Sequence, residues 1–449
     1  MSDWQDPEEH VDRAHELFEA GRWAEAERLL RRAISAHPDR AEWHFNLGLT
    51  LEAGGKYAEA LASFTESARL NPTDVQSIIA CAVNNLRLDQ PAPARDLLAK
   101  ARKLDPDRLD AFVHSIEALS RTGDHDGAEV MFYQALQLEG NHADAYANMG
   151  ECLIERSLFE KAAACLREAL KLEPGLERVQ ARLAYCLHKT GQSDKARLLY
   201  LRELRENPGD TETLMDLGDL LADTDRLPEA SEKFRRVLEL DPKNAHAHFA
   251  LATIAARQQR LAPAARHLKR VLKLDPAYPS ARRRLARVRL ELQQHDRAIA
   301  LLRREAAAFT TAPETFSVDD LRDLGMLLLD VKHHRRAARV FGVLRSRTPT
   351  DALAHHYFGV ASLMAGESSR GIAAEIRAVR LDPKLLAAWH NLSLAFINAR
   401  RWRHARMCLN RAIAVAPSDH GIKRLRLKFH VRRLISVFET FLPRNTAAR

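Results

Sequence analysis

Aromatic residues are scarce in this chain of 449 residues, in which Phe, Trp and Tyr together make up 6%. Alanine is abundant instead, which suits helices that pack closely over small side chains. The five cysteines stand apart from one another, and no two of them form a CxxC or CxxxC pair. Because an odd number of isolated cysteines fits a reducing compartment, we expect free, buried thiols and a cytoplasmic location.

Long apolar segments are missing as well. No stretch of about 20 uninterrupted apolar residues occurs, so the sequence predicts no membrane span. Residues 1–9 are acidic and lack the basic-then-apolar layout of a secretory signal.

The sequence motifs of enzymes and of phosphate or metal sites are also absent. The chain contains no GxxxxGKS/T, GxGxxG, HExxH or GxSxG sequence. The pairs His333–His334 and His355–His356 are adjacent on predicted helices, so their side chains diverge and do not converge on a metal. We therefore expect no catalytic residue, no metal site and no cofactor, and hence no enzyme.

What the chain does contain is an alanine that recurs every 34 residues. The series runs through Ala26, Ala60, Ala94, Ala128, Ala162, Ala196, Ala230, Ala264 and Ala298, and after a step of 39 residues it resumes with Ala337 and later Ala405. Proline near the end of most units follows the same period. A period of this length is typical of a stack of similar supersecondary units and not of a globule with one core.

The second unit, residues 41–72, shows the local pattern most clearly. Apolar residues at i, i+3, i+4 and i+7 on both sides of Gly54–Gly55 predict two amphipathic helices joined by a tight turn. Pro72 ends the second helix, because proline cannot continue the hydrogen-bond ladder. A small residue in the first helix, Gly48, and a bulky one in the second, Phe64, favour close interdigitation of the pair.

This pattern resembles the tetratricopeptide repeat. The matching residues are Leu47, Gly48, Tyr57, Ala60, Phe64 and Pro72 in the second unit, and Trp389, Leu392, Trp402, Ala405, Leu409 and Pro417 in the twelfth. The resemblance extends over nearly the whole chain as twelve units. It implies an all-α solenoid, a right-handed superhelix of helix-turn-helix repeats whose first helices line a concave groove for peptides or partner proteins. It implies no chemistry.

Four segments are expected on this basis. Residues 7–310 form repeats 1–9, residues 311–317 an inserted inter-repeat loop, residues 318–417 repeats 10–12, and residues 418–442 a basic amphipathic capping helix. The insertion is either a longer surface loop or a bend between two blocks. In repeat 11, Gly371 replaces the alanine and Glu375 the bulky residue. Because a carboxylate is rarely buried unpaired, we expect that helix to rotate or to pack loosely.

Charge divides the chain. Residues 1–250 carry a formal net charge of −14 and residues 251–449 one of +23, within a total of +9. This asymmetry points to a partner. We expect the segment from Arg257 to Arg433 to bind an acidic protein, with Arg283, Arg284 and Arg287 nearest the groove. Two basic clusters stand out, at residues 282–289 and 423–433. Nucleic acid is the less favoured ligand, because these clusters lack interleaved aromatic residues apart from Phe429. For the terminal helix, an anionic membrane surface stays open as an alternative to capping.

Charged residues also alternate in sign along the predicted groove. Acidic, basic and acidic first helices either pair with one another or form a patterned groove for a mixed-charge peptide. Asparagine at the sixth position of a repeat, which in the family often hydrogen-bonds an extended ligand, occurs only three times, so a continuous asparagine ladder is absent. The groove candidates are Asn46, Asn148, Arg182, Asp216, Asp219, Arg283, Arg284, Arg287 and Asn391.

The sequence therefore predicts a non-catalytic scaffold or adaptor that binds a partner protein or an extended peptide. One alternative is a regulatory or substrate-selecting subunit of an enzyme on a separate chain, such as a glycosyltransferase. Another is nucleic-acid binding through the basic half.

Overall fold

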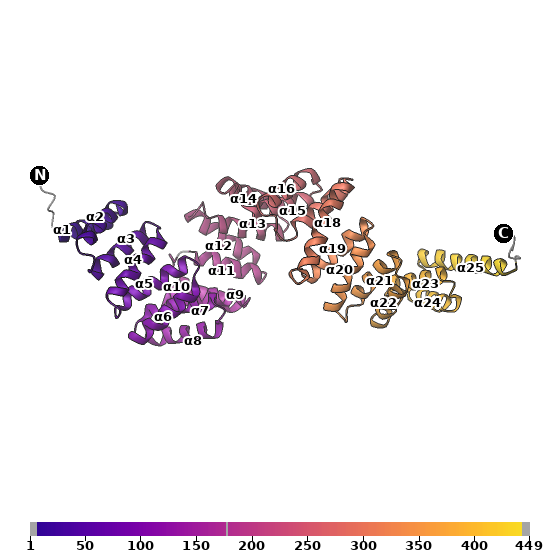
Figure 1. Ribbon diagram of the computed structural model, residues 1–449, viewed down its shortest axis with the longest axis horizontal. Helices are drawn as coiled ribbons and strands as arrows, with labels where there is room; N and C mark the ends of the chain where they lie inside the picture. Colours follow the sequence, from indigo (N-terminus) through magenta and orange to yellow (C-terminus); the bar gives the residue numbers. More distant parts are fainter. Residues whose placement is uncertain (1–6, 177, 442–449) are drawn as a thin grey trace, which may run out of the picture. The chain divides into compact units, whose positions relative to one another are not determined.

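Helices account for the described part of the chain. The structure, a computed structural model, describes residues 7–176 and 178–441, and these form twenty-five α-helices and one short 3-10 helix, with no strand among them (Figure 1). The chain divides into two compact units, residues 1–233 and 234–449, and the boundary falls within α14. The all-α array of helical hairpins is confirmed.

Unit 1 consists of paired helices. Its helices are α1 (Pro7–Glu19), α2 (Trp23–Ala36), α3 (Ala41–Ala53), α4 (Tyr57–Leu70), α5 (Val75–Arg87), α6 (Pro91–Leu104), α7 (Leu109–Arg121), α8 (His125–Leu138), α9 (Ala143–Glu155), α10 (Phe159–Leu172), α11 (Val179–Lys189), α12 (Ser193–Glu206), α13 (Thr211–Asp223) and the first part of α14 (Leu227–Leu240). Odd-numbered helices are the first helices of the repeats, and even-numbered helices are the second.

Unit 2 continues the same alternation and ends in one unpaired helix. Its further helices are α15 (Ala245–Arg257), α16 (Leu261–Leu274), α17 (Ala281–Glu291), α18 (His295–Thr311), η1 (Pro313–Thr315), α19 (Val318–Asp330), α20 (His334–Arg347), α21 (Ala352–Met364), α22 (Ser368–Leu381), α23 (Leu386–Asn398), α24 (Trp402–Val415) and α25 (His420–Phe441).

The hairpin turns repeat with the period of the sequence. Each contains one residue with positive φ, and Gly55 shows the bonding: its N–H donates to the Glu52 carbonyl at 2.9 Å, and the Lys56 N–H donates to the Leu51 carbonyl at 2.8 Å. This pattern closes a helix through a left-handed residue. The positions are Gly21, Gly55, Asp89, Gly123, Ser157, Gly191, Asp225, Gln259, Gln293, Lys332, Gly366 and Arg400.

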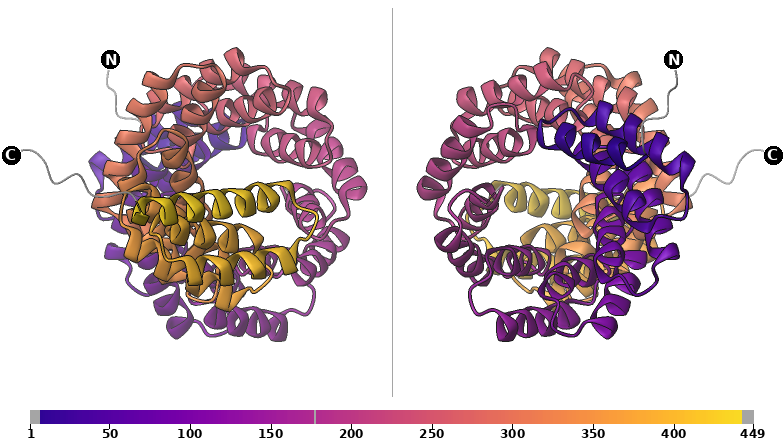
Figure 2. Two further views of the ribbon diagram at one scale, coloured as in Figure 1. Left: turned by 90° about the vertical axis from the view of Figure 1, so that its right-hand side faces the viewer. Right: turned by 90° about the vertical axis from the view of Figure 1, so that its left-hand side faces the viewer.

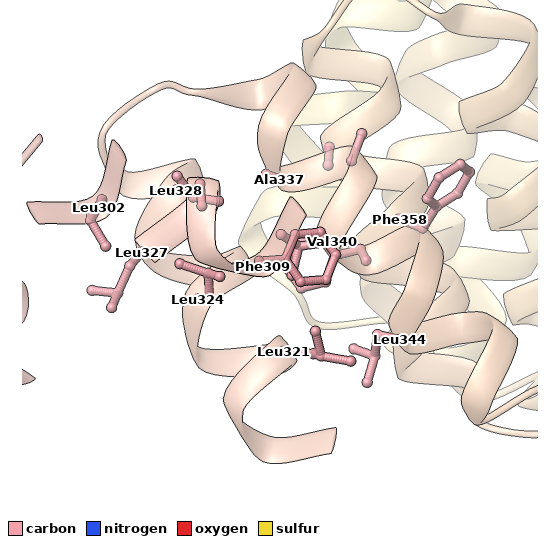
Figure 3. Packing of buried hydrophobic residues seen from close by; sticks show 14 of the residues in the cluster. Leu302, Phe309, Leu321, Leu324, Leu327, Leu328, Ala337, Val340, Leu344 and Phe358 are labelled. Atoms are coloured by element: carbon pink, nitrogen blue, oxygen red, sulfur yellow. The ribbon is translucent and has the colours of Figure 1, made fainter. Parts of the chain in front are cut away.

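Small residues face large ones inside the hairpins, as expected. A Cβ added at Gly48 would lie 2.6 Å from the Phe64 ring, so the glycine is required for this approach. The recurring alanines, Ala162 and Ala337 among them, are fully buried. Figure 3 shows the corresponding packing in unit 2, where apolar side chains from α18 to α21 meet in one cluster.

The register slip before α19 is absorbed by packed structure. α18 runs for 17 residues where the other second helices have 14, and a 3-10 turn at Pro313–Thr315 follows it. Phe309 and Phe316 are buried with their rings edge to face, 5.7 Å apart. Arg347 donates to the carbonyls of Phe316 and Pro313, the latter at 2.8 Å. These contacts tie the extra residues to α20.

The expectation of a rotated or loosely packed helix in repeat 11 is wrong. Glu375 is fully buried in the regular helix α22, where it is bonded by His356 Nδ1 at 2.9 Å and by Asn391 Nδ2 at 3.1 Å. Gly359 leaves room for it, since a Cβ there would lie 2.7 Å from the Glu375 Cγ. The carboxylate therefore replaces a bulky apolar residue by means of two polar partners from neighbouring helices.

The last helix lies against the last hairpin. α25 contacts both α23 and α24 at the C-terminal end of unit 2 (Figures 1 and 2). Its contact residues are Ile422, Leu425 and Phe429, each at most 4% exposed. Residue 442, the expected end of this segment, lies outside the described residues.

Candidate partner-binding site

Unit 1 contains a cavity of about 1020 Å³ beside the first helices α7, α9 and α11. Five carboxylates and three guanidinium groups contribute to its wall. It is lined by Glu117, Ser120, Arg121, Asp144, Ala147, Asn148, Glu151, Glu155, Leu166, Glu173, Gly175, Leu176, Arg178, Val179 and Arg182.

The cavity coincides with an irregular helix start. α11 begins at Val179 and has 11 residues where most first helices have 13. Arg178, just before it, has a φ of 65°, a conformation that is unfavourable for a residue with a Cβ. The preceding link supplies Gly175 and Leu176 to the cavity wall. A missing half-turn of helix thus lies beside the space.

Arg182 is the centre of an ion-pair network. Its Nε lies 2.8 Å from Glu151 of α9, and its Nη1 lies 2.8 Å from Glu212 of α13. Arg178 also pairs with Glu212. Burial raises the pKa of Glu151, and the charges of Arg182 and Arg178 oppose that shift. Arg178, Arg182, Glu151 and Glu212 therefore pair with one another across neighbouring first helices, which is the first of the two arrangements expected from the sequence.

Two other carboxylates at the cavity are open to a ligand. Asp144 and Glu155 are exposed. Glu155 accepts a hydrogen bond from Ser120 Oγ at 2.6 Å and keeps its other oxygen available. Asp144 has no hydrogen bond or ion pair to any other described residue. The cavity therefore carries negative charge that the neighbouring arginines do not balance.

The three candidate asparagines differ in what they can offer. Asn148 lines the cavity and donates from Nδ2 to the Val113 carbonyl at 3.1 Å, which leaves its Oδ1 as an acceptor. Asn46 is half-buried, and its side-chain amide has no partner in the described part of the chain. Asn391 is engaged with the buried Glu375. Only Asn148 combines a cavity position with a free polar atom.

Asp216 and Asp219 lie on α13, both half-buried. Burial raises the pKa of Asp216 to about 6, against the attraction of Arg182 and with the repulsion of Asp219. Neither residue lines the cavity. The hydroxyl of the fully buried Tyr200, whose pKa is raised by burial and then by the Asp216 charge, has no hydrogen-bond partner in the described part of the chain.

Arg283 departs from the expected groove position. It is 4% exposed and lies between α17, α18 and α19, where it pairs with Glu305 at 2.6 Å and with Asp320. Arg282 reaches the other oxygen of Glu305, also at 2.6 Å. Because its charge is used inside the unit, Arg283 cannot be presented to a ligand without breaking a buried network.

The neighbouring arginines are also engaged. The Arg284 guanidinium lies 4.7 Å from the centre of the Phe249 ring and donates to Thr253 Oγ1 at 2.9 Å. Burial, and then the charge of Arg287, lowers the pKa of Arg284. Arg287 remains half-exposed and pairs with Asp323. The first-helix arginines of unit 2 are thus bound mainly to their own unit.

A further set of exposed cations lies on the second helices of unit 2. We call them the outer row: Arg266, Lys269, Lys273, Arg297, Arg303, Arg304, Arg335, Arg336, Arg339, Arg347, Arg370, Arg377, Arg380, Arg403, Arg406 and Arg411. These residues lie on α16, α18, α20, α22 and α24, which together carry three carboxylates. Only Asp296 is exposed, since Glu305 and Glu375 are buried. Sequence reasoning missed this surface, although Arg304, Arg377 and Arg411 occupy one repeat position.

Across residues 7–176 and 178–441, no group of three or more His, Cys, Asp or Glu side chains is placed to hold a metal ion. No helix in that part of the chain combines the length and apolarity needed to cross a membrane.

Two family models match the sequence. Both are described as tetratricopeptide repeat: one matches residues 11–75, 148–211 and 215–265, and the other matches residues 119–167 and 255–313. Together they cover more than half of the chain. No significantly similar sequence was found among curated proteins.

Several solved structures match this chain at low sequence identity. Yeast Tom70 is 14% identical over 96% of each chain, with a TM-score of 0.38. PilF of Pseudomonas aeruginosa is 20% identical over 48% of this chain and 97% of its own, with a TM-score of 0.42. TTC0263 of Thermus thermophilus is 24% identical over 41% of this chain and 100% of its own, with a TM-score of 0.37. At these scores none of them assigns a partner.

Proposed function

Because this chain belongs to the tetratricopeptide repeat family, we propose that it is a non-catalytic scaffold that binds partner proteins along its hairpins. Solenoids of this kind present extended surfaces built from successive repeats. The observation that carries the proposal is the cavity of unit 1, where Asn148, Asp144 and Glu155 offer polar atoms beside the first helices.

The ligand proposed for this cavity is an extended segment with a basic side chain. Asp144 and Glu155 supply carboxylates for a Lys or Arg of the partner, and a charge-assisted hydrogen bond of this kind is stronger than a neutral one. The free Oδ1 of Asn148 can accept a backbone N–H from the same segment. The ion pairs around Arg182 hold the neighbouring helices in register for that contact.

For unit 2 the proposed partner is an acidic protein surface, bound through the outer row. The first-helix arginines are a poor choice, since Arg283 is buried and Arg287 is paired with Asp323. Arginine dominates the outer row, and its planar guanidinium group suits bidentate contacts with carboxylates. In the described part of unit 2 no Phe, Trp or Tyr is exposed, so stacking platforms for single-stranded nucleic acid are absent.

A photo-crosslinking experiment tests the cavity. Benzoylphenylalanine at Ala147, in the cavity wall, should crosslink one discrete partner from the organism's lysate. The same label at Tyr133, which is 56% exposed on a second helix, is the matched control and should not. Equal labelling from both positions, or none from Ala147, would contradict the proposal. A captured enzyme would favour the alternative of a substrate-selecting subunit.

A charge variant sharpens this result. Asp144→Lys with Glu155→Lys should abolish the Ala147 crosslink, because a basic ligand would then meet like charge. Asp126→Lys with Glu129→Lys makes the same change of charge on α8 and should leave the crosslink intact. If both pairs act alike, the contact depends on net charge alone and not on the cavity.

A further inference from the structure

α25 has two apolar stripes on opposite sides. One stripe, Ile422, Leu425 and Phe429, is buried against α23 and α24. The other recurs at i, i+4 and i+7 and is formed by Leu427, Val431 and Leu434. Since a helix turns by about 100° per residue, the second stripe lies about half a turn from the first.

The second stripe is open to solvent. Leu427 is 66% exposed, Val431 48% and Leu434 58%, and the adjacent Ile435 and Val437 are 48% and 46% exposed. Beyond Phe429 none of the described side chains of α25 is buried. A helix that merely caps a solenoid presents a polar outer face. The outer face of α25 presents aliphatic side chains, so capping alone does not account for this helix.

Cations border the open stripe on both flanks. Arg424, Lys428 and Arg432 follow one flank at intervals of four residues, and Arg426 and Arg433 lie on the other. No Asp or Glu occurs from residue 420 to residue 438. No ion pair joins these five cations to the described part of the chain. Their charges are therefore free for an external anion.

The flanking charge decides between the occupants of the stripe. A second copy of α25 would bring cations against cations, which opposes association. A helix that lies in a bilayer surface has lipid headgroups on both flanks and acyl chains beneath it, which matches a stripe bordered on both sides by cations. Four to eight Lys or Arg on such a helix are typical of binding to anionic lipids.

We propose that α25 docks this protein on an anionic phospholipid surface, with Leu427, Val431 and Leu434 in the boundary between headgroups and acyl chains. The flanking arginines and lysines pair with the lipid phosphates. Contact of this kind is peripheral and reversible, since a single short amphipathic helix does not span the bilayer.

Vesicle flotation with the full-length protein tests the proposal. We expect binding to phosphatidylcholine vesicles that contain about 30% phosphatidylglycerol, no binding to pure phosphatidylcholine, and weaker binding as salt rises. Replacing Arg424, Lys428 and Arg432 by Glu should weaken binding at least roughly 100-fold, since the loss of each cation near such a surface costs about a fivefold effect and the added carboxylates repel the lipid phosphates. Absence of binding to the anionic vesicles at low salt overturns the proposal.

Matched variants separate the site from net charge. Lys161→Glu, Arg167→Glu and Lys171→Glu change the charge of the protein equally on α10 and should bind nearly as the parent does. The aliphatic variant Leu427→Ser, Val431→Ser, Leu434→Ser should bind at least about tenfold more weakly, while Leu198→Ser, at a leucine 63% exposed in unit 1, should not. Unchanged binding of the aliphatic variant would overturn insertion of the stripe.

A fluorescent label reports insertion directly. Four of the five native cysteines are buried and Cys165 is half-buried, so in a Cys165→Ser background a nitrobenzoxadiazole label can be directed to Val431→Cys. Its emission should rise and shift to the blue with anionic vesicles, and that of a label at Leu198→Cys should not. If the Val431 label responds to a captured acidic protein and not to vesicles, the occupant of the stripe is that protein and the membrane proposal is wrong.

Discussion

The two units are built from the same hairpins and carry opposite charge. Residues 1–233 contain 28 Lys and Arg against 43 Asp and Glu, whereas residues 234–449 contain 41 against 17. Yet the recurring alanines Ala162 and Ala337 are equally buried, and most first and second helices keep 13 and 14 residues in both units. The hairpin therefore tolerates either charge, because only its buried positions are constrained.

The units also differ in where their cations find partners. In unit 1, Arg31 pairs with Glu27 of its own helix at 3.0 Å and with Glu59 of the next second helix at 2.7 Å. In unit 2 the buried pairs join α17 to α18 and α19, and α21 to α22. Among the described residues of the outer row, only Arg370 has an ion pair, which it makes with Glu367. Like charges gathered on one surface repel each other, so an excess of this kind indicates an external anion.

Breaking the buried network should have the largest effect. Glu305→Ala removes the buried carboxylate that Arg282 and Arg283 share and leaves Arg283 with only the half-buried carboxylates of α19. The free energy of unfolding of unit 2 should fall by up to about 3–5 kcal/mol. In unit 1, Glu212→Ala removes a half-exposed partner of Arg182 and should cost less than about 1 kcal/mol. Urea denaturation, with hydrogen exchange on peptides of α17–α19 and α11–α13, measures both. Equal losses would mean that burial does not distinguish the two networks.

Overpacking should affect the two units alike. Phe in place of Ala162 or Ala337 inserts a ring where no space exists, and each change should cost about 1–3 kcal/mol. Because a repeat contacts only its neighbours, loss of hydrogen-exchange protection should stay within the altered hairpin and those next to it. A large loss in one unit and none in the other would show that the hairpins are not equivalent.

Replacing cations by Glu should slow association with an acidic ligand more in unit 2 than in unit 1. Arg304→Glu, Arg377→Glu and Arg411→Glu together should slow association with poly-L-glutamate about tenfold at low salt and much less at physiological salt. The matched variant carries Glu at Arg32, Lys100 and Arg202, the same repeat position in unit 1, and should have a smaller effect because acidic neighbours already oppose the ligand there. Stopped-flow fluorescence measures both rates. Equal slowing would mean that the outer row acts only through the net charge of the protein and not through the position of its cations.

The smallest effect concerns Asp216. Its pKa is raised to about 6 by burial, so the folded protein holds this proton more tightly than the unfolded chain does. Stability is therefore lost as pH rises from about 4 through 6, and Asp216→Asn should raise the stability at pH 7.5 by about 1 kcal/mol, with no gain near pH 3.5. Urea denaturation at the two pH values checks the sign. A gain that is independent of pH would contradict a role for the proton.

The hairpins and their small-against-large packing follow from the sequence, whereas several turns do not. Gly54–Gly55 is a turn signal that needs no context. Ser157 and Arg400 adopt the same left-handed conformation although their side chains disfavour it. The packing of the two helices on either side decides those turns. The cavity beside Arg178 escaped prediction for a similar reason, because one backbone angle shortens α11.

Polar partners were harder to predict than the core. Glu375 looked like a defect, since its partners His356 and Asn391 come from the helices before and after it. Arg283 was expected in the groove because its position in the helix points that way in a regular repeat. Glu305 lies in the extended α18, and its carboxylate draws Arg283 inward. Both cases depend on side-chain atoms that meet within about 3 Å.

By itself the sequence determined the architecture of this protein, its family resemblance and its division of charge. These depend on periodicity and composition, which survive any small shift of one helix against another. Only the tertiary structure decided which charges are used inside the fold and which are open. Pairing requires atoms within a few ångströms of each other, and a period of 34 residues does not fix distances on that scale.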